Sequence, residues 1–270
     1  MGGSSHAERV FRVQRAFTRL GGRAHGPGAL ARAAGLDDSS VYRILQSGVH
    51  EGIFVREGRG LYRLGSGAPQ LGLKALAHSP APEAAHALLE GLRRATGGAL
   101  TFLYLLAPFG GAHRQCVDMA VGDSDLTELG MTPRAVQTVE HSLRVGAAGR
   151  AILAYLPEAI QSEVLERPVP AEAGPGAYRD DVRLVASLHR IRARGYALGH
   201  EECAAGWNEC AAPVTWDGLV MGSVLVMKPK RVMPRCPVTV IDAVEQTAAG
   251  LADLGRGGPV PSNGNDPTPK

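Results

Sequence analysis

The sequence predicts an α+β protein with two domains. Its 270 residues are enough for two separate cores. Short helical patterns and two strand-like runs fill the first part of the chain, and the remainder combines amphipathic helices with apolar runs of strand length. We expect a first domain at residues 7–65, a helical linker at 66–79, a second domain at 80–255 and a disordered tail at 256–270.

The first domain opens with a predicted helix from Ala7 to Leu20. Its apolar residues recur at helical spacing, as seen for Val10, Val13 and Phe17. The glycine pair at 21–22 ends this helix, because two successive glycines disfavour a continued helical turn.

Two short helices separated by a tight turn come next. Ala31 is small enough to let a second helix approach, Gly35 can adopt the positive φ of a sharp turn, and Val41 can fill the angle between the helices. The acidic pair at 37–38 offers a capping carboxylate for the second helix, which we expect over Ser39–Gln46. This spacing is typical of a helix-turn-helix.

A predicted β-hairpin follows and makes the module a winged variant. Ile53–Arg56 and Leu61–Leu64 read as strands joined by the loop Glu57–Gly60. The alternative is a small helical domain whose glycine turn matches the motif by chance. Charge favours the first interpretation: residues 1–75 hold 11 Lys/Arg and 5 Asp/Glu (net +6), whereas the rest hold 18 and 21 (net −3). A basic end on a mildly acidic chain indicates a nucleic-acid-binding module.

The second helix of this motif is the predicted recognition helix. A helix in the major groove of double-stranded DNA presents its N-terminal residues to base edges. Arg43 and Gln46 suit base or phosphate contacts, Tyr42 either contacts DNA or packs under the helix, and wing arginines can reach the backbone or minor groove. The predicted DNA-binding residues are Ser39, Ser40, Tyr42, Arg43, Gln46, Arg56 and Arg59.

Helices and extended runs alternate in the second domain. We expect helices at Glu83–Thr96, within Leu143–Pro157, and at Ala159–Leu165, Asp180–Arg194 and Val238–Leu254. On the helix from 180 to 194, the apolar face is predicted to be Val182, Val185, Leu188 and Ile191. Extended runs are Ala99–Leu106, Ala112–Val121, Tyr196–Glu202, Trp207–Thr215 and Leu219–Met227, the last two joined at Asp217–Gly218. We interpret Gly122–Glu140 as strand plus loop.

Composition and cysteine usage narrow the class of protein. The sequence has no apolar run of about 18 residues, so it predicts no membrane span. The first ten residues lack the apolar region of a secretory signal. Four cysteines, at 116, 203, 210 and 236, form no disulfide framework. We therefore expect a cytoplasmic protein without cofactor or metal.

Four stretches share their order and spacing with one family. They are LARAAGLDDSSVYRILQSGVHEGIFVREGRGLYRLG, VGAAGRAILAYLP, HRIRARGYALGHEE and CAAPVTWDGLVMGSVLVMKP. Along nearly its whole ordered length, the chain resembles an IclR-type transcriptional regulator. The resemblance implies a winged helix-turn-helix followed by an effector-binding domain similar to GAF and PAS sensors, with helices on an antiparallel sheet. It also implies a homodimer or homotetramer on a DNA operator; residues 107–140 depart most from the family.

The run His200–Cys210 leaves other chemistry open. Its histidine, glutamates and two cysteines suggest a metal-sensing or redox-sensing site, although Cys203 and Cys210 have neither zinc-like nor thioredoxin-like spacing. The family pattern makes Glu202 structural, bonding backbone amides. An enzyme with an N-terminal interaction module is the third class, but no GxSxG, HExxH or CxxC motif supports catalysis.

The resemblance also places an effector pocket, at Ala147, Ala148, Gly199, Glu209, Leu225 and Met227. Strand positions are polar in relatives that bind small carboxylates, whereas Leu225 and Met227 are apolar and, two apart, share one face. Gly199 supplies no side chain, so we expect a pocket that is roomier at one end, with Glu209 as its only charge. An apolar or aromatic effector that is neutral or amine-bearing fits this pocket, oriented by amides at the helix start. The alternative is that the pocket is vestigial and its apolar residues only fill the core.

Overall fold

The computed structural model describes residues 5–20, 22–76, 82–107, 111–123, 142–216 and 218–255. Its contacts divide the chain into two compact units, Met1–Ser79 with Pro157–Ser162 and the remainder, and each is described by itself. The expected tail at 256–270 and nearly all of the expected strand plus loop at Gly122–Glu140 lie outside the described residues.

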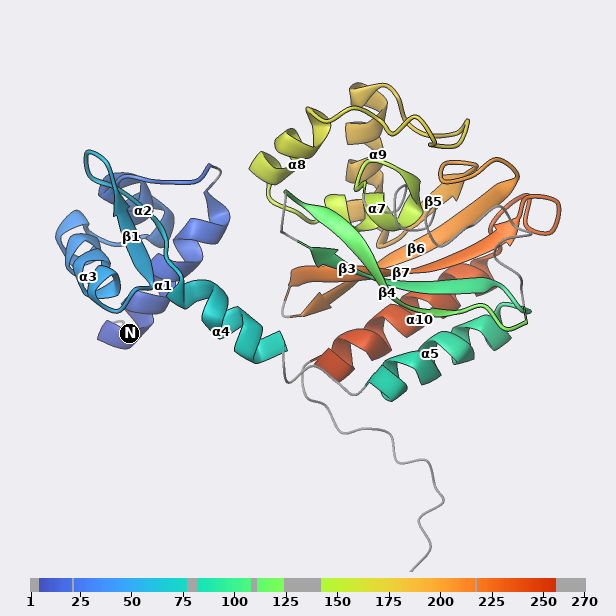
Figure 1. Ribbon diagram of the computed structural model, residues 1–270, viewed down its shortest axis with the longest axis horizontal. Helices are drawn as coiled ribbons and strands as arrows, with labels where there is room; N and C mark the ends of the chain where they lie inside the picture. The colour runs from blue at the N-terminus through green and yellow to red at the C-terminus, as the bar shows by residue number, and fades with distance from the viewer. Residues whose placement is uncertain are drawn as a thin grey trace, which may run out of the picture. The chain divides into compact units, whose positions relative to one another are not determined.

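The first unit contains helices and one hairpin in the predicted order (Figure 1). Its elements are α1 (His6–Arg19), α2 (Pro27–Ala34), α3 (Asp38–His50), β1 (Phe54–Glu57), β2 (Leu61–Leu64) and α4 (Gly67–Leu76). The antiparallel pairing of β1 with β2 confirms the wing. The helix predicted over Ser39–Gln46 is longer than expected, because α3 continues past Gln46 to His50.

The turn between α2 and α3 depends on a glycine and an aspartate. Gly35 has φ +62°, and a β-carbon there would lie 2.8 Å from Nη2 of Arg12, which donates to the Gly35 carbonyl. Of the two acidic candidates, Asp37 is the cap: its Oδ1 accepts from the Ser40 N–H at 2.8 Å. The residues that break α2 and start α3 are thus those expected from local rules.

A small apolar core joins the helices to the wing. Ala31 and Val41 are 2% and 0% exposed, as the helix-turn-helix spacing requires. Phe54 of β1 stacks on Phe17 of α1, with ring centroids 5.1 Å apart. Gly48 makes this possible, since a β-carbon there would lie 2.1 Å from the Phe54 ring. The wing is therefore seated on the helices.

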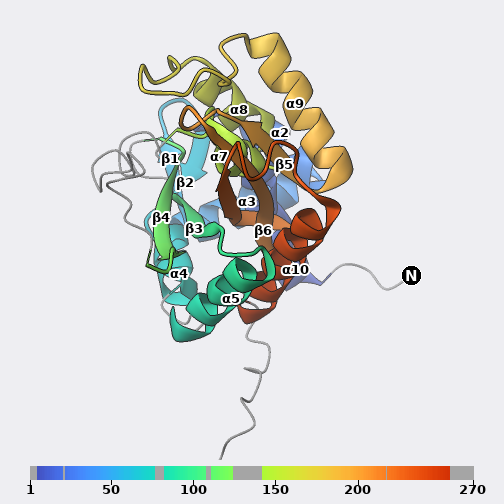
Figure 2. The ribbon, with the colours of Figure 1, turned by 90° about the vertical axis from the view of Figure 1, so that its right-hand side faces the viewer.

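The second unit is built on a five-stranded antiparallel sheet in the order β4-β3-β7-β6-β5. The strands are β3 (Leu100–Ala107), β4 (His113–Ala120), β5 (Ala197–His200), β6 (Trp207–Trp216) and β7 (Leu219–Pro229). Two neighbouring helices, α5 (Pro82–Ala95) and α10 (Val238–Gly255), cover one face, and α7 (Gly146–Leu153) lies on the other (Figures 1 and 2). The remaining described helices are α8 (Glu158–Leu165) and α9 (Asp181–Arg194), of which α9 contacts α7. This arrangement confirms the α+β prediction.

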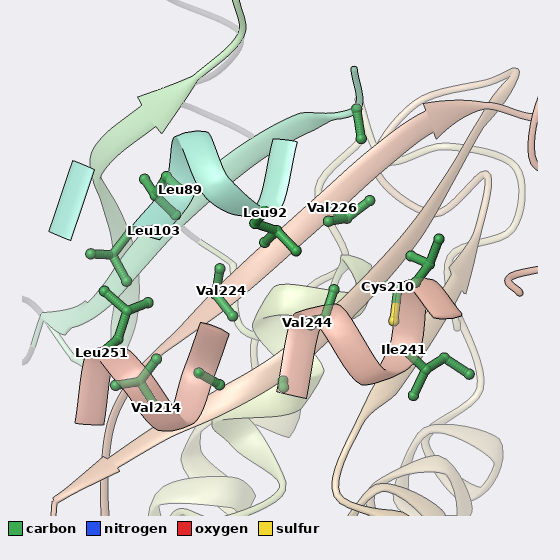
Figure 3. Packing of buried hydrophobic residues seen from close by; sticks show 14 of the residues in the cluster. Leu89, Leu92, Leu103, Cys210, Val214, Val224, Val226, Ile241, Val244 and Leu251 are labelled. Carbon is green, nitrogen blue, oxygen red and sulfur yellow. The ribbon is translucent and has the colours of Figure 1, made fainter. Parts of the chain in front are cut away.

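Alternation along the strands gives the sheet two distinct faces. One face carries Cys210, Val214, Val224 and Val226, which pack with residues of α5 and α10 in the main core (Figure 3). The alternate residues of β6 and β7 face α7. Among these, Glu209 lies opposite Gly199 on one side and Met227 on the other.

The apolar face predicted for α9 is wrong at its first position. Val182 is 78% exposed, whereas Leu184, Leu188 and Ile191 are buried. Two residues correspond to about 200° around a helix, so Val182 lies nearly opposite Leu184. The buried stripe keeps helical spacing but begins two residues later.

Candidate DNA-binding surface and effector site

The exposed side of α3 carries most of the predicted DNA-binding residues. Tyr42 is 49% exposed, so the alternative in which it packs under the helix is wrong. Arg43 is also exposed and makes no hydrogen bond or ion pair with any described residue. The Ser39 hydroxyl donates to Oδ1 of Asp37 at 2.6 Å and belongs to the cap. Arg56 and Arg59 of the hairpin are exposed as expected.

Two predicted DNA contacts need correction. Ser40 is only 6% exposed, because it lies one helical turn before the buried Ile44 on the core face. Gln46 is exposed, but its Nε2 donates to the Tyr62 hydroxyl at 2.8 Å. Since Tyr62 is 1% exposed on β2, this hydrogen bond braces α3 against the wing.

Four of the predicted effector residues meet at the N-terminus of α7. Glu209 is 1% exposed, and its Oε2 accepts from the Ala147 N–H at 2.6 Å. Its Oε1 accepts from the Cys203 N–H at 3.1 Å. A carboxylate is favoured here because the first N–H groups of a helix lack helical partners and carry partial positive charge. Glu209 therefore supplies, from within the chain, the anion that this helix end favours.

The positions of Glu209 and Arg114 contradict three expectations about the pocket. Gly199 does not leave open space, since a β-carbon there would lie 2.9 Å from Oε2 of Glu209. The Ala147 amide is not available to orient an effector, because Glu209 accepts from it. Glu209 is also not the only charge: the fully buried Arg114 of β4 brings Nη1 within 3.6 Å of a β-carbon placed on Gly146, and Oε2 of Glu209 lies 2.9 Å from the same point.

Beneath α7, the sheet face is partly polar and partly apolar. Leu225 and Met227 are 1% and 4% exposed and lie on this face, which confirms that they share a side. Ser223, two residues earlier, donates its hydroxyl to the Ala148 carbonyl at 3.2 Å. Both alanines are fully buried, and Ala148 is thus tied to β7 while Ala147 is tied to β6.

A second buried carboxylate lies beside this cluster. Glu202 is 2% exposed and accepts two hydrogen bonds from Arg150, Nε to Oε2 at 2.9 Å and Nη2 to Oε1 at 2.5 Å. Burial raises the pKa of Glu202 to about 7, against the opposing effect of Arg150. Glu202 is structural, as expected, but its main partner is an arginine side chain. Neither Arg114 nor Arg150 was predicted, because an arginine in a strand or helix pattern is normally exposed.

A cavity of about 430 Å³ opens next to Glu202. It is lined by residues 175–180, Arg183, His200 and Glu202. The ring of Tyr178, in its wall, lies 4.9 Å from the guanidinium carbon of Arg150. None of the six predicted effector residues lines this cavity.

The metal and redox alternatives raised by the run 200–210 find no matching geometry. Across the parts of the chain that the structure describes, no cluster of three or more His, Cys, Asp or Glu could hold a metal. Cys203 lies against Gly146 on the α7 side, whereas Cys210 lies in the core on the opposite face. These two cysteines therefore do not form a redox pair.

Comparison with known proteins identifies a relative of the second domain. Residues 135–251 match the family described as bacterial transcriptional regulator IclR C-terminal. The second domain is therefore similar to the C-terminal domain of IclR-type transcriptional regulators. Three of the four sequence stretches that carry the resemblance lie within the matched residues, and the fourth, at residues 30–65, lies outside them. The matched family consists of transcriptional regulators.

Solved structures share the fold over nearly the whole chain. An IclR homolog from Microbacterium hydrocarbonoxydans, complexed with 4-hydroxybenzoate, is 22% identical with a TM-score of 0.54 and covers 94% of this chain and 100% of its own. An IclR homolog from Microbacterium sp. strain HM58-2 is 22% identical with a TM-score of 0.52, and the match covers 93% of this chain and 98% of the homolog. The IclR of Thermotoga maritima is 20% identical with a TM-score of 0.53, and the match covers 92% of this chain and 98% of that protein. Curated proteins give no match. No described helix has the length and apolar character needed to cross a membrane.

Proposed function

We propose that this protein is an IclR-type cytoplasmic repressor that binds a double-stranded DNA operator and responds to a small apolar or aromatic molecule. The observation that carries the proposal is the exposed side of α3, where the side chains of Tyr42 and Arg43 are exposed shortly after the residue that caps the helix, Asp37. The net charge of +6 in residues 1–75, from 11 basic and 5 acidic residues, favours phosphate contacts. The exposed wing arginines, Arg56 and Arg59, add to this surface.

Selection of duplexes from a random DNA pool tests operator binding. The full-length protein should enrich one pseudo-palindromic sequence, because a symmetric dimer reads two equivalent half-sites. Enrichment of no sequence, with binding that vanishes at moderate salt, would reduce the protein to a non-specific DNA binder.

Self-association is proposed to involve α1. Phe11 is 58% exposed on this helix, next to several arginines, and a large exposed aromatic group of this kind suits an interface. We expect at least a homodimer in solution and a homodimer or homotetramer on the operator. Light scattering should show wild type above monomer mass at micromolar concentration and a smaller mass for Phe11→Arg; a monomeric wild type would contradict the proposal.

The effector is proposed to lie on the α7 side of the sheet, against Leu225 and Met227. Glu209 already accepts from the Ala147 N–H, and a second carboxylate beside this buried charge would be repelled. A neutral or amine-bearing ligand is therefore favoured over a carboxylate at the helix end. The Microbacterium hydrocarbonoxydans regulator, complexed with 4-hydroxybenzoate, supports the aromatic part of this class. That ligand also carries a carboxylate, which we do not expect at the helix end of this chain.

A thermal-shift screen of the full-length protein tests this ligand class. Phenol, indole and benzylamine should raise the melting temperature, whereas pyruvate and glyoxylate should not. Met227→Ser should lose the shift, and Leu219→Ser, on the same strand but at a residue 61% exposed, should keep it. Stabilisation by keto acids and by no apolar compound would overturn the assignment.

A further inference from the structure

A pair of thiols lies on the face of the sheet opposite Glu209. Cys210 of β6 is fully buried beside Ile241 of α10 (Figure 3). Cys236, just before α10, is partly exposed and packs against the same core. Each of the two thiols shifts the pKa of the other, which indicates that their side chains are neighbours. The fold thus brings together two cysteines that lie 26 positions apart (236 − 210).

Buried contacts hold both members of this pair. Asn208 lies two residues before Cys210 on the same face of β6 and is 3% exposed. Its Nδ2 donates to the Met233 carbonyl at 2.8 Å, and Met233 is itself 2% exposed. The segment that carries Cys236 is therefore anchored to the strand that carries Cys210.

The two thiols differ in the direction in which their pKa is shifted. Interaction with Cys210 lowers the pKa of Cys236, whereas the same interaction and burial raise the pKa of Cys210. The thiolate is the nucleophilic form of cysteine. Since Cys236 is also the exposed member, a small oxidant reaches it first, and Cys210 is positioned to react second.

We propose that Cys236 and Cys210 form a reversible oxidation site that a hydroperoxide converts to a disulfide. The Cys236 thiolate attacks one peroxide oxygen, the O–O bond breaks, and a sulfenic acid forms as hydroxide leaves and takes up a proton. The Cys210 sulfur then attacks the Cys236 sulfur, the S–O bond breaks, and water leaves with the Cys210 proton. Two thiols are oxidised to one disulfide, and one hydrogen peroxide is reduced to two waters.

The other two cysteines provide matched controls. Burial and the nearby Glu209 raise the pKa of Cys203 well above its ordinary value, and Cys203 lies on the α7 side. Cys116 is on β4, separated from β6 by two intervening strands. Neither can reach Cys210 or Cys236 without disrupting the sheet.

The test treats folded full-length protein with hydrogen peroxide, blocks remaining thiols with iodoacetamide, and maps the peptides by mass spectrometry. A Cys210–Cys236 linkage, lighter by two hydrogens and lost on treatment with dithiothreitol, should form in wild type and in the Cys116→Ser, Cys203→Ser double variant. In Cys210→Ala, a dimedone adduct should instead trap the sulfenic acid at Cys236. This substitution keeps a small side chain in the core.

Two results would overturn the proposal, and both are read on wild type, so neither depends on a variant folding. One is full alkylation of Cys210 and Cys236 after peroxide treatment and denaturation. The other is a disulfide that links either residue to Cys116 or Cys203. Operator binding can be measured on the reduced protein, so failure here leaves the regulator function untouched.

Discussion

Replacing Glu209 by alanine should open an anion site at the N-terminus of α7. The variant removes the carboxylate that accepts from the Ala147 and Cys203 N–H groups at 2.6 and 3.1 Å. Each buried N–H left without an acceptor costs about 1–3 kcal/mol. Loss of an anion at the helix end costs about 1 kcal/mol. Relief of the buried carboxylate's desolvation offsets about 1–3 kcal/mol of this loss.

The balance predicts a destabilisation of about 2–4 kcal/mol, or roughly 6–12 °C in the melting temperature of a domain this size. Acetate should then reverse the loss, because it can fill the space and accept from the same amides. At about 100 times its Kd, it would restore about 2.7 kcal/mol. Wild type should not respond to acetate, since Glu209 already occupies the position.

Calorimetry across an acetate series, with sodium chloride at equal ionic strength as reference, measures both effects. Glu209→Gln is the matched control: it fills the same space with one acceptor oxygen, so it should lose stability without acetate rescue. Glu172→Ala, at an exposed loop position, should change stability by no more than about 0.5 kcal/mol. The reasoning fails if Glu209→Ala matches wild type in stability, or if acetate stabilises both proteins equally.

Three further outcomes follow from contacts near the two sites. Tyr62→Phe should weaken operator binding about as much as Gln46→Ala in an anisotropy titration, because each removes the same 2.8 Å hydrogen bond. A much larger loss of affinity for Gln46→Ala would show that Gln46 contacts a base. The pKa of Glu202 rises to about 7 in the folded protein from an unfolded value of 4.5, so the stability measured by urea denaturation should fall as pH increases between these values. Glu202→Gln should lack this dependence, and equal slopes of stability against pH for the two proteins would contradict the prediction. Hydrogen bonds from the Ser39 hydroxyl and a backbone amide hold the pKa of Asp37 below its usual range, so the melting-temperature difference between wild type and Asp37→Ala should shrink as pH falls below 3.8; a constant difference would exclude this charge effect.

The helix-turn-helix and wing could be predicted because their determinants are local. A positive φ at Gly35 and a capping carboxylate at Asp37 act on neighbouring residues, and both lie where the pattern put them. The prediction that Ser40 is exposed was wrong because of its position around the helix. Its polar character suggested exposure, but the turn of α3 places it on the core face. Val182 failed in the same way, as an apolar residue turned to solvent.

The cluster around α7 depends on pairings that sequence spacing does not encode. The β5–β6 register puts Gly199 opposite Glu209, and the glycine serves to make room for that side chain rather than for a ligand. Arg114, in the region least like the family, and Arg150 look like surface residues until the fold buries them. Sequence therefore predicted which residues lie near the start of α7 but not the charges buried beside them.

Operator binding by Arg43→Ala tests the account most directly. A wild-type operator from the duplex selection would be titrated by fluorescence anisotropy with wild type, Arg43→Ala and the control Arg190→Ala, which removes an exposed arginine of α9. If Arg43 contacts a base, its loss should weaken binding by about 5-fold to 150-fold, equivalent to 1–3 kcal/mol, and relax preference at one base pair of each half-site. Arg190→Ala should bind as wild type does. Equal affinity and unchanged base preference for Arg43→Ala would show that α3 is not the recognition helix.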